Sequence, residues 1–420
     1  MFSKLLCVGL LARRGLARPR LDEVPEFEDE DIASGKALAE LSKLALKGAE
    51  KLYNEKCDAT NVKVRKEWRT LSKPQRRQYI AAVQCLLEKP SILEPGRVPA
   101  AKNHFDDFVY AHLNQTSIVH GTVRPPSPIP RHGLPTQGNF LPWHRFFIHT
   151  YENSLTSCGY KHPLPYWEWG LDVDSPKDLP LFDGSDTSVS GDGAPVPHGD
   201  LMVQSPGEPI VWRLPPGEGG GCIHSGPFVN MTVNFRPKAL SNAGTLDKVR
   251  NDEATVYEPR CIKRDLNSHL ARAASTFRNT TGVILKAGEL DMFQGLLEGR
   301  FTHNADDPTA GIHVSGHLTF GGDPGGDVFL SPADPAFYFH HAQIDRVFWI
   351  WQMLDFENRN KMAMTITPNN NPPSRNATLD DPLWLDPLAT EVVIRDMMNT
   401  VDGDHLCYVY ESHCRGFVVP

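Results

Sequence analysis

Residues 334–346 read DPAFYFHHAQIDR, and this stretch says more about the fold than any other part of the chain. Asp334 suits the N-terminal cap of a helix, and Pro335 suits its first turn because a proline there loses no helical hydrogen bond. A strongly apolar helix is therefore predicted from this point to about Leu354. Two adjacent histidines, His340 and His341, stand inside this otherwise apolar helix.

A histidine pair precedes that helix. Residues 311–317 read GIHVSGH, with His313 and His317 four positions apart. Residues at i and i+4 share one face of a helix, so the two imidazoles form a chelating pair. A third imidazole from the 334–346 helix would complete a three-nitrogen site. Such a site suits copper, zinc or iron and leaves positions open for another ligand.

Three more histidines, His112, His120 and His144, lie earlier in the chain. Residues 139–145, NFLPWHR, place His144 in the first turn of a predicted helix with aromatic neighbours. Taken alone, His112 is better explained as a hydrogen-bonded core histidine, and a two-histidine helical pair is a weak motif. Two sets of three histidines, without cysteine or carboxylate at ligand spacing, nevertheless favour two metal ions. The HExxH motif of zinc proteases is absent.

Helical periodicity predicts further helices around these histidines. They are expected from Ile32 to Leu52, from Ser72 through Leu87, from about Asn103 to Ser117, from Leu141 to Leu155 and from Asn267 to Phe277. Residues 171–245 are rich in Gly, Pro, Asp and Ser, which predicts extended surface loops. Residues 407–410 form a short strand-like piece.

The composition excludes some partners. The chain has 43 Lys and Arg against 51 Asp and Glu, a net charge of -8, and no long basic run, so no nucleic acid partner is expected. No segment approaches the roughly 20 uninterrupted apolar residues of a membrane-spanning helix, so no membrane association is expected.

Several features indicate a secreted protein. Residues 1–17 resemble a short secretory signal. Seven cysteines follow it, none in a Cys-x-x-Cys pair, which suits a few disulfides plus one free thiol without predicting which cysteines pair. We expect a signal at 1–17, an N-terminal arm or pro-segment at 18–56 and one catalytic domain at 57–420. Acceptor triplets for N-glycosylation begin at Asn114, Asn230, Asn279 and Asn376.

Together the quoted segments resemble the tyrosinase and catechol oxidase family of type-3 dicopper proteins, particularly its short fungal forms, over roughly residues 65–412. The resemblance implies a mainly α fold, in which a four-helix bundle core holds a dinuclear copper site, with long irregular loops and a few short strands. It also implies dioxygen as co-substrate. The copper ligands that it implies are His112, His120 and His144 for one ion and His313, His317 and His341 for the other, with His340 as a non-ligand neighbour.

The resemblance also bears on residues around the ligands. Tyr408-Val409-Tyr410 looks like the tyrosine motif that closes the catalytic domain of this family, so a C-terminal shielding domain is expected to be lacking. Asp345 lies one helical turn beyond His341 and is a candidate hydrogen-bond partner for a ligand N–H. The alternative is a salt bridge with Arg346 or another arginine. Phe337 is expected to pack against the site.

The chain departs from the family pattern in the first histidine set. His120 and His144 stand twenty-four positions apart, whereas short fungal members reach the Trp-His pair within nine residues of the middle ligand. Removing residues 123–137 would restore that spacing, so we hypothesise that they are a retained short intron or a true loop insertion. They include His132, a rival for the middle ligand. Ile118 stands two residues before His120, where some relatives have a cysteine, so no thioether link is expected.

A further departure concerns Val314, which follows the first ligand of the second copper. Several efficient phenol hydroxylases of the family have an asparagine there, thought to hold a proton-abstracting water, and valine has no hydrogen-bonding group in its side chain. The sequence therefore predicts a dicopper oxidase that converts o-diphenols, small phenolic substrates, to o-quinones with dioxygen. The alternatives are a monophenol monooxygenase, an o-aminophenol oxidase and, less favoured, a haemocyanin-like dioxygen carrier. The oligomeric state is not predicted.

Overall fold

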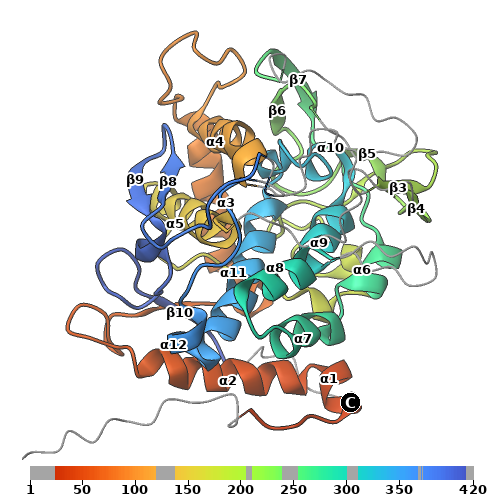
Figure 1. The fold of residues 1–420 in the computed structure, drawn as a ribbon. Coiled ribbons are helices and arrows are strands. Elements are labelled where there is room, and N and C mark those ends of the chain that lie inside the picture. The colour runs from red at the N-terminus through yellow and green to blue at the C-terminus, as the bar shows by residue number, and fades with distance from the viewer. Residues whose placement is uncertain are drawn as a thin grey trace, which may run out of the picture.

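The computed structural model describes residues 24–119, 138–204, 211–238, 254–299, 311–367, 370 and 372–412. Its helices are α1 (Asp29–Ser34), α2 (Lys36–Glu50), α3 (Lys73–Glu88), α4 (His104–Val119), α5 (Phe140–Ser157), α6 (Ser268–Ala274), α7 (Phe277–Lys286), α8 (Leu290–Glu298), α9 (Ile312–Phe320), α10 (Gly322–Gly325), α11 (Ala336–Leu354) and α12 (Phe356–Arg359). Its strands are β1 (Lys63–Arg65), β2 (Gly193–Pro195), β3 (Leu201–Gln204), β4 (Val211–Leu214), β5 (Gly220–Ile223), β6 (Thr232–Phe235), β7 (Tyr257–Cys261), β8 (Pro382–Leu385), β9 (Ala389–Val393) and β10 (Tyr408–Tyr410). The prediction of a mainly α fold with a few short strands is confirmed (Figure 1).

Helix α11 runs through the middle of the molecule (Figure 1). Every side chain from Ala336 to Leu354 is buried, so this helix has no face toward solvent. A helix that is buried all round needs other elements on every side, and α2, α5, α7 and α9 all contact it. At its start, the Asp334 carboxylate accepts a hydrogen bond of 2.8 Å from the Ala336 N–H, the capping role expected from the sequence.

The helix predicted from Ile32 to Leu52 is present but divided. Gly35 has a φ of 82°, in the left-handed region that favours glycine, and it separates α1 from α2. Along α2 one stripe of apolar side chains is buried, as an amphipathic helix on a core requires. The stripe consists of Ala37, Leu38, Leu41, Ala45 and Ala49.

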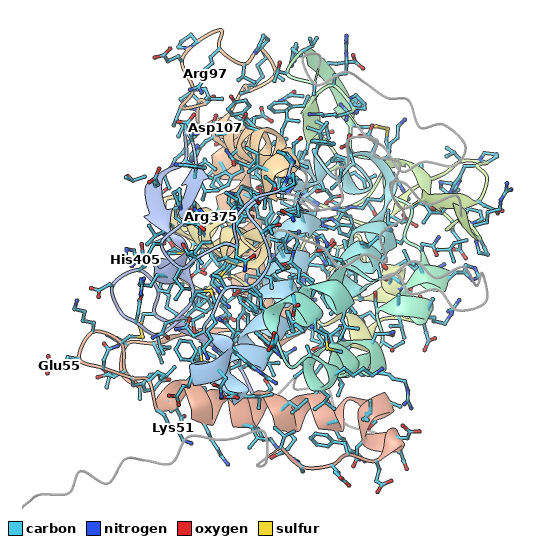
Figure 2. The ribbon with its side chains drawn as sticks, viewed as in Figure 1. Lys51, Glu55, Arg97, Asp107, Arg375 and His405 are labelled. Atoms are coloured by element: carbon cyan, nitrogen blue, oxygen red, sulfur yellow. A yellow bond between two sulfur atoms is a disulfide. The ribbon has the colours of Figure 1, made fainter. Side chains whose placement is uncertain are left out.

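The stripe of α2 packs against α11. The approach is close at Gly48, where an added Cβ would lie 2.1 Å from the Met353 carbonyl oxygen. Figure 2 shows Lys51 at the end of α2 and Glu55 in the loop that follows. Helix α2, the long helix of the N-terminal arm, therefore packs on the central helix.

The region after residue 260 contains more helices than the sequence predicts. The helix expected from Asn267 to Phe277 ends at Ala274, and α7 begins at Phe277. The Thr276 hydroxyl accepts a hydrogen bond from the Asn279 N–H, which caps α7 and separates it from α6. Helix α8 was not predicted. It has only nine residues, and an apolar pattern this short does not distinguish a helix from a strand.

The described parts of residues 171–245, expected as loops, contain short antiparallel pairs. β2 pairs with β5, β3 with β4, and β6 with β7. These strands have three to five residues each, too few for an alternating pattern to be recognised. The strand-like piece expected at 407–410 is β10, which pairs in parallel with β1.

Disulfides fasten three parts of the described chain. Cys57 joins Cys407, Cys85 joins Cys158, and Cys222 joins Cys261. The first connects the loop after α2 to the chain just before β10, and the second connects α3 to the end of α5. The expectation of a few disulfides is confirmed. Cys414, the remaining cysteine after the proposed signal, lies outside the described residues.

Candidate metal centre

Three imidazole nitrogens converge between α9 and α11. The Nε2 atom of His317 lies 3.2 Å from Nε2 of His313 and 3.1 Å from Nε2 of His341. Two nitrogens bound to one tetrahedral ion at about 2.0–2.1 Å lie about 3.3 Å from each other. The His317 nitrogen therefore has, from each of the other two, the separation of ligands that share an ion. His313 and His317 stand one helical turn apart on α9, as the sequence predicts.

His112 on α4 and His144 on α5 lie beside this cluster. The rings of His144 and His341 are stacked, with centroids 4.4 Å apart and planes 13° apart. The rings of His112 and His144 have centroids 5.8 Å apart. Because His144 touches a ring of the other set, the histidines from the two distant parts of the chain face one site and do not line separate cavities.

Acceptors on the Nδ1 side fix the orientation of three of these rings. The Nδ1 atom of His112 lies 3.0 Å from the Phe329 carbonyl oxygen, and that of His144 lies 2.8 Å from the Phe140 carbonyl oxygen. The Nδ1 atom of His313 lies 3.0 Å from the Glu298 carboxylate. Each acceptor places the ring proton on Nδ1, so the lone pair of a neutral imidazole is on Nε2, where a metal would bind.

Burial favours the neutral form of His112, His144 and His341. It lowers the pKa of His112 to about 4. Burial also holds the pKa values of His144 and His341 well below the usual imidazole value, and the neighbouring histidines lower them further. Neutral imidazole is the form that binds metal, so at neutral pH no proton has to leave these rings before an ion enters.

Two phenylalanines contact both histidine sets. The Phe337 ring stacks on His341 with centroids 4.2 Å apart, and it meets His112 edge-on at 5.3 Å. The Phe140 ring lies 4.4 Å from His144 and 4.9 Å from His313. Such contacts exclude water and hold the rings in place. Phe337 thus packs against the site, as the sequence predicts.

Asp345 does not behave as a partner of a ligand ring. Among the described residues its carboxylate accepts hydrogen bonds from Arg145 Nε at 2.6 Å, Arg65 Nη1 at 3.1 Å, and the hydroxyls of Tyr408 and Tyr410 at 2.6 Å each. The salt-bridge alternative is therefore the one found, although not with Arg346. The physical reason is that four donors already surround the carboxylate.

Val314 has apolar neighbours. It packs, partly buried, against the small apolar cluster of Leu270, Ala274 and Leu318, at the contact between α6 and α9. Arg346, the other sequence candidate for a salt bridge, donates instead to Glu168 at 2.7 Å.

Some predicted residues lie outside the described chain, and some important ones were not predicted. His120, His132 and the segment 123–137 lie outside the described residues. Sequence reasoning missed Glu298, because nothing local marks an acidic residue at the end of α8 as a partner of His313. It also missed Arg65, whose guanidinium lies over the Tyr408 ring at 3.7 Å and which reaches Asp345 from a strand 280 residues away.

The donor set fits copper. All the converging groups are imidazole nitrogens, and the carboxylate of Glu298 contacts a ring instead of the cluster. Copper, zinc and iron accept such ligands, and a three-imidazole set leaves a position open for an exogenous molecule. Two copper ions held in adjacent sets of this kind would supply two electrons to one bound molecule.

Comparisons with known proteins agree with this geometry. The family model described as the common central domain of tyrosinase matches residues 102–354. The tyrosinase-like protein orsC of Emericella nidulans is 34% identical over 312 residues, which cover 72% of this chain and 77% of that protein. The N-acetyl-6-hydroxytryptophan oxidase ivoB of the same organism is 32% identical over 373 residues, 85% of this chain and 94% of that protein.

A solved structure is also similar. A variant of the polyphenol oxidase of Thermothelomyces thermophila superposes with a TM-score of 0.80 at 34% identity, covering 91% of this chain and all of that one. Among the described residues, no helix is long and apolar enough to span a membrane.

Proposed function

The chain belongs to the tyrosinase family of dicopper oxidases, and from that premise we propose that it oxidises o-diphenols to o-quinones with dioxygen as the electron acceptor. The observation that carries the proposal is the convergence of His313, His317 and His341, with His144 stacked on the last of them. Relatives in the family act on different phenolic compounds, so the choice of o-diphenols depends on residues beside the ligands.

We assign the first copper to His112, His120 and His144, and the second to His313, His317 and His341. The tautomers of His112, His144 and His313 support this assignment, since each has an acceptor at Nδ1. His120 is taken from the family resemblance, with His132 as its rival. When bound, the copper pair supplies two electrons to dioxygen and recovers them from the phenolic substrate.

The protein residues have the tasks of binding, orientation and exclusion of water. Glu298 holds the His313 ring and places a negative charge next to a ligand, which strengthens that ring as a donor. Phe140 and Phe337 pack against rings of both sets and hold them in place. Asp345 keeps α5, α11, β1 and β10 together through its arginine and tyrosine contacts.

Val314 supports diphenol oxidation over phenol hydroxylation. A monophenol has to lose its hydroxyl proton before hydroxylation, and Val314 offers no group that could hold a proton-accepting water near the second copper. A catechol has two adjacent acidic hydroxyls and depends less on such a water. The same argument leaves an o-aminophenol oxidase as the nearest alternative.

Oxygen uptake by the copper-loaded protein tests the proposal. Rates are measured with 4-tert-butylcatechol, tyramine and 2-aminophenol, and the catechol is expected to be oxidised fastest and tyramine slowest. A tyramine rate equal to the catechol rate would overturn the diphenol assignment, and oxygen binding without turnover would identify a carrier. Val314→Asn is expected to raise the ratio of tyramine to catechol rates, whereas the apolar control Val314→Leu leaves that ratio unchanged.

We further propose that the protein is exported, with a signal at 1–17, the arm at 18–56 and the catalytic domain at 57–420. The signal lies outside the described residues. The three disulfides support the proposal, because such bonds persist in oxidising compartments. Mass spectrometry of the protein from culture medium tests it, since an intact Met1 on the secreted form would contradict cleavage.

A further inference from the structure

A fourth histidine lies within the nitrogen cluster of the second copper. One nitrogen from each of His313, His317, His340 and His341 lies within 4.8 Å of the other three. The family resemblance gives His340 no role in binding metal. Adjacent residues on a helix point about 100° apart, so standing next to His341 does not by itself bring His340 to the cluster. The structure nevertheless places a ring nitrogen of His340 there.

The surroundings of His340 are unusual for a buried polar side chain. Its ring is fully buried, lies parallel to His313 at 5.6 Å, and meets His317 edge-on at 4.4 Å. Trp169 covers it from another side, with centroids 5.3 Å apart. Within the described chain neither ring nitrogen has a partner of good hydrogen-bond geometry, and the nearest polar contact is a looser one to the backbone of His313.

A buried imidazole without a well-formed hydrogen bond is costly, so its presence needs an explanation. A metal ion would provide one, because a nitrogen lone pair that coordinates an ion no longer needs a donor. The His317 nitrogen is already at coordination distance from those of His313 and His341. The His340 nitrogen has to approach by at most about 1.5 Å to reach the tetrahedral separation of about 3.3 Å, a movement within the range of a ring rotation.

We propose that His313, His317, His340 and His341 form a closed four-imidazole site for a single ion with a tetrahedral preference, namely Zn²⁺ or its analogue Co²⁺. Four protein ligands leave no open position, as in structural zinc sites. An ion held in this way blocks the second copper site, so zinc competes with copper for the protein. The proposal concerns the ligand set alone and does not depend on which phenol is oxidised.

Gly316 gives a second means of perturbing His340. A Cβ at Gly316 would lie 2.2 Å from both Nδ1 and Cε1 of the His340 ring, so the ring has to move when alanine is introduced. Gly282 on α7 is a matched control, because a Cβ there meets nothing within 4 Å. Gly316→Ala and Gly282→Ala thus make the same chemical change, and only the first displaces the fourth nitrogen.

Titration of the metal-free full-length protein with Co²⁺ tests the proposal, because tetrahedral Co²⁺ has intense visible absorption bands and higher coordination numbers give weak ones. The wild-type protein is expected to bind one Co²⁺ per chain with intense bands. His340→Phe keeps a ring and removes the nitrogens, so the bands should weaken and shift and the Co²⁺ affinity should fall at least about tenfold. Gly316→Ala should act in the same direction, whereas Gly282→Ala should match the wild type.

Two further measurements separate this proposal from the copper assignment. His144→Ala removes a ligand of the first set only, so the Co²⁺ spectrum should be retained. Copper uptake of His340→Phe should remain at two ions per chain, which also shows that the variant is folded. A wild-type Co²⁺ spectrum without intense bands, or a spectrum and affinity unchanged in both His340→Phe and Gly316→Ala, would overturn the four-imidazole site. A failure to oxidise catechol would leave this result standing.

Discussion

Replacing Asp345 with asparagine removes one charge from the centre of the protein and leaves the shape of the side chain almost unchanged. The carboxylate is 4% exposed and pairs with two guanidiniums that are fully buried, those of Arg65 and Arg145. Whichever way the asparagine amide turns, one of these arginines faces an N–H group where it had an oxygen. The hydroxyls of Tyr408 and Tyr410 share the oxygen that Arg65 contacts.

The expected loss of stability depends on which hydrogen bonds Arg65 and Arg145 keep. Arg65 keeps its bonds to Glu152, at 2.7 and 3.0 Å. Arg145 keeps only neutral acceptors, the Gln352 side chain and two backbone carbonyls, so its charge becomes uncompensated. Breaking a buried pair in this way costs about 3–5 kcal/mol. With an unfolding entropy of roughly 2.1 cal/mol/K per residue, that lowers the Tm of a chain of this length by about 3–6 °C.

Thermal unfolding of the metal-free protein measures the effect. The control is Asp380→Asn, because Asp380 pairs with Arg395 at the surface, where both side chains are more than half exposed. That change is expected to cost less than about 0.5 kcal/mol. A fall in Tm below about 1 °C for Asp345→Asn would refute the reasoning. Copper affinity should be unchanged in the folded variant. Copper loss without destabilisation would instead mean that Asp345 orients a ligand.

Three other predictions concern separate parts of the protein. Glu298→Gln should lower copper affinity about 10- to 100-fold in competition with a chelator, because His313 loses its charged acceptor. The exposed control Glu289→Gln, at the N-cap of the same helix, should not lower it. Burial raises the pKa of Glu67 to about 7, so the folded state holds a proton between about pH 4.5 and 7 that the unfolded state releases, and stability falls as pH rises through that window. Urea unfolding should therefore show that the free energy of unfolding of the wild type falls by up to about 3 kcal/mol from pH 5 to pH 8, and that it falls less in Glu67→Gln. Equal losses in the two proteins would contradict this assignment to Glu67. Glycopeptide analysis should find Asn230 occupied, since it and Thr232 are exposed, and Asn279 unoccupied, since its side chain caps α7 and Thr281 is buried; a glycan at Asn279 would argue against this.

The parts of the protein that the sequence predicts are those in which local geometry is sufficient. His313 and His317 share a helix face because of the helical period, and the apolar run around His341 identifies a buried helix without further information. Glu298 and Arg65 could not be found in this way. Each reaches its partner through the path of the chain between distant elements, which a single sequence does not specify. Gly35 divides a helix whose apolar stripe continues on both sides, so the stripe alone predicts one helix.

The two histidine sets also differ in how far local helix geometry fixes their ligands. Helix geometry brings His313 and His317 together, and the next helix supplies His341. The first set has His112 and His144 on two helices, α4 and α5, and the chain between them contains both candidates for the third nitrogen, His120 and His132. No helical period fixes a ligand within such a connection, so the sequence leaves two candidates where the other set leaves one.

The choice between His120 and His132 depends on whether the mature protein contains residues 123–137. Without this segment the spacing from His120 to His144 shortens from twenty-four positions to nine, the value that the family resemblance leads us to expect. All valine codons begin with GT and one glutamine codon, CAG, ends in AG, so Val123 and Gln137 are compatible with the end dinucleotides of an intron. Sequencing of transcripts is expected to show messages that lack the segment. If every message encodes it, the intron hypothesis fails. Copper counts of His120→Ala and His132→Ala then identify the third ligand, since only the loss of a true ligand reduces two coppers per chain toward one.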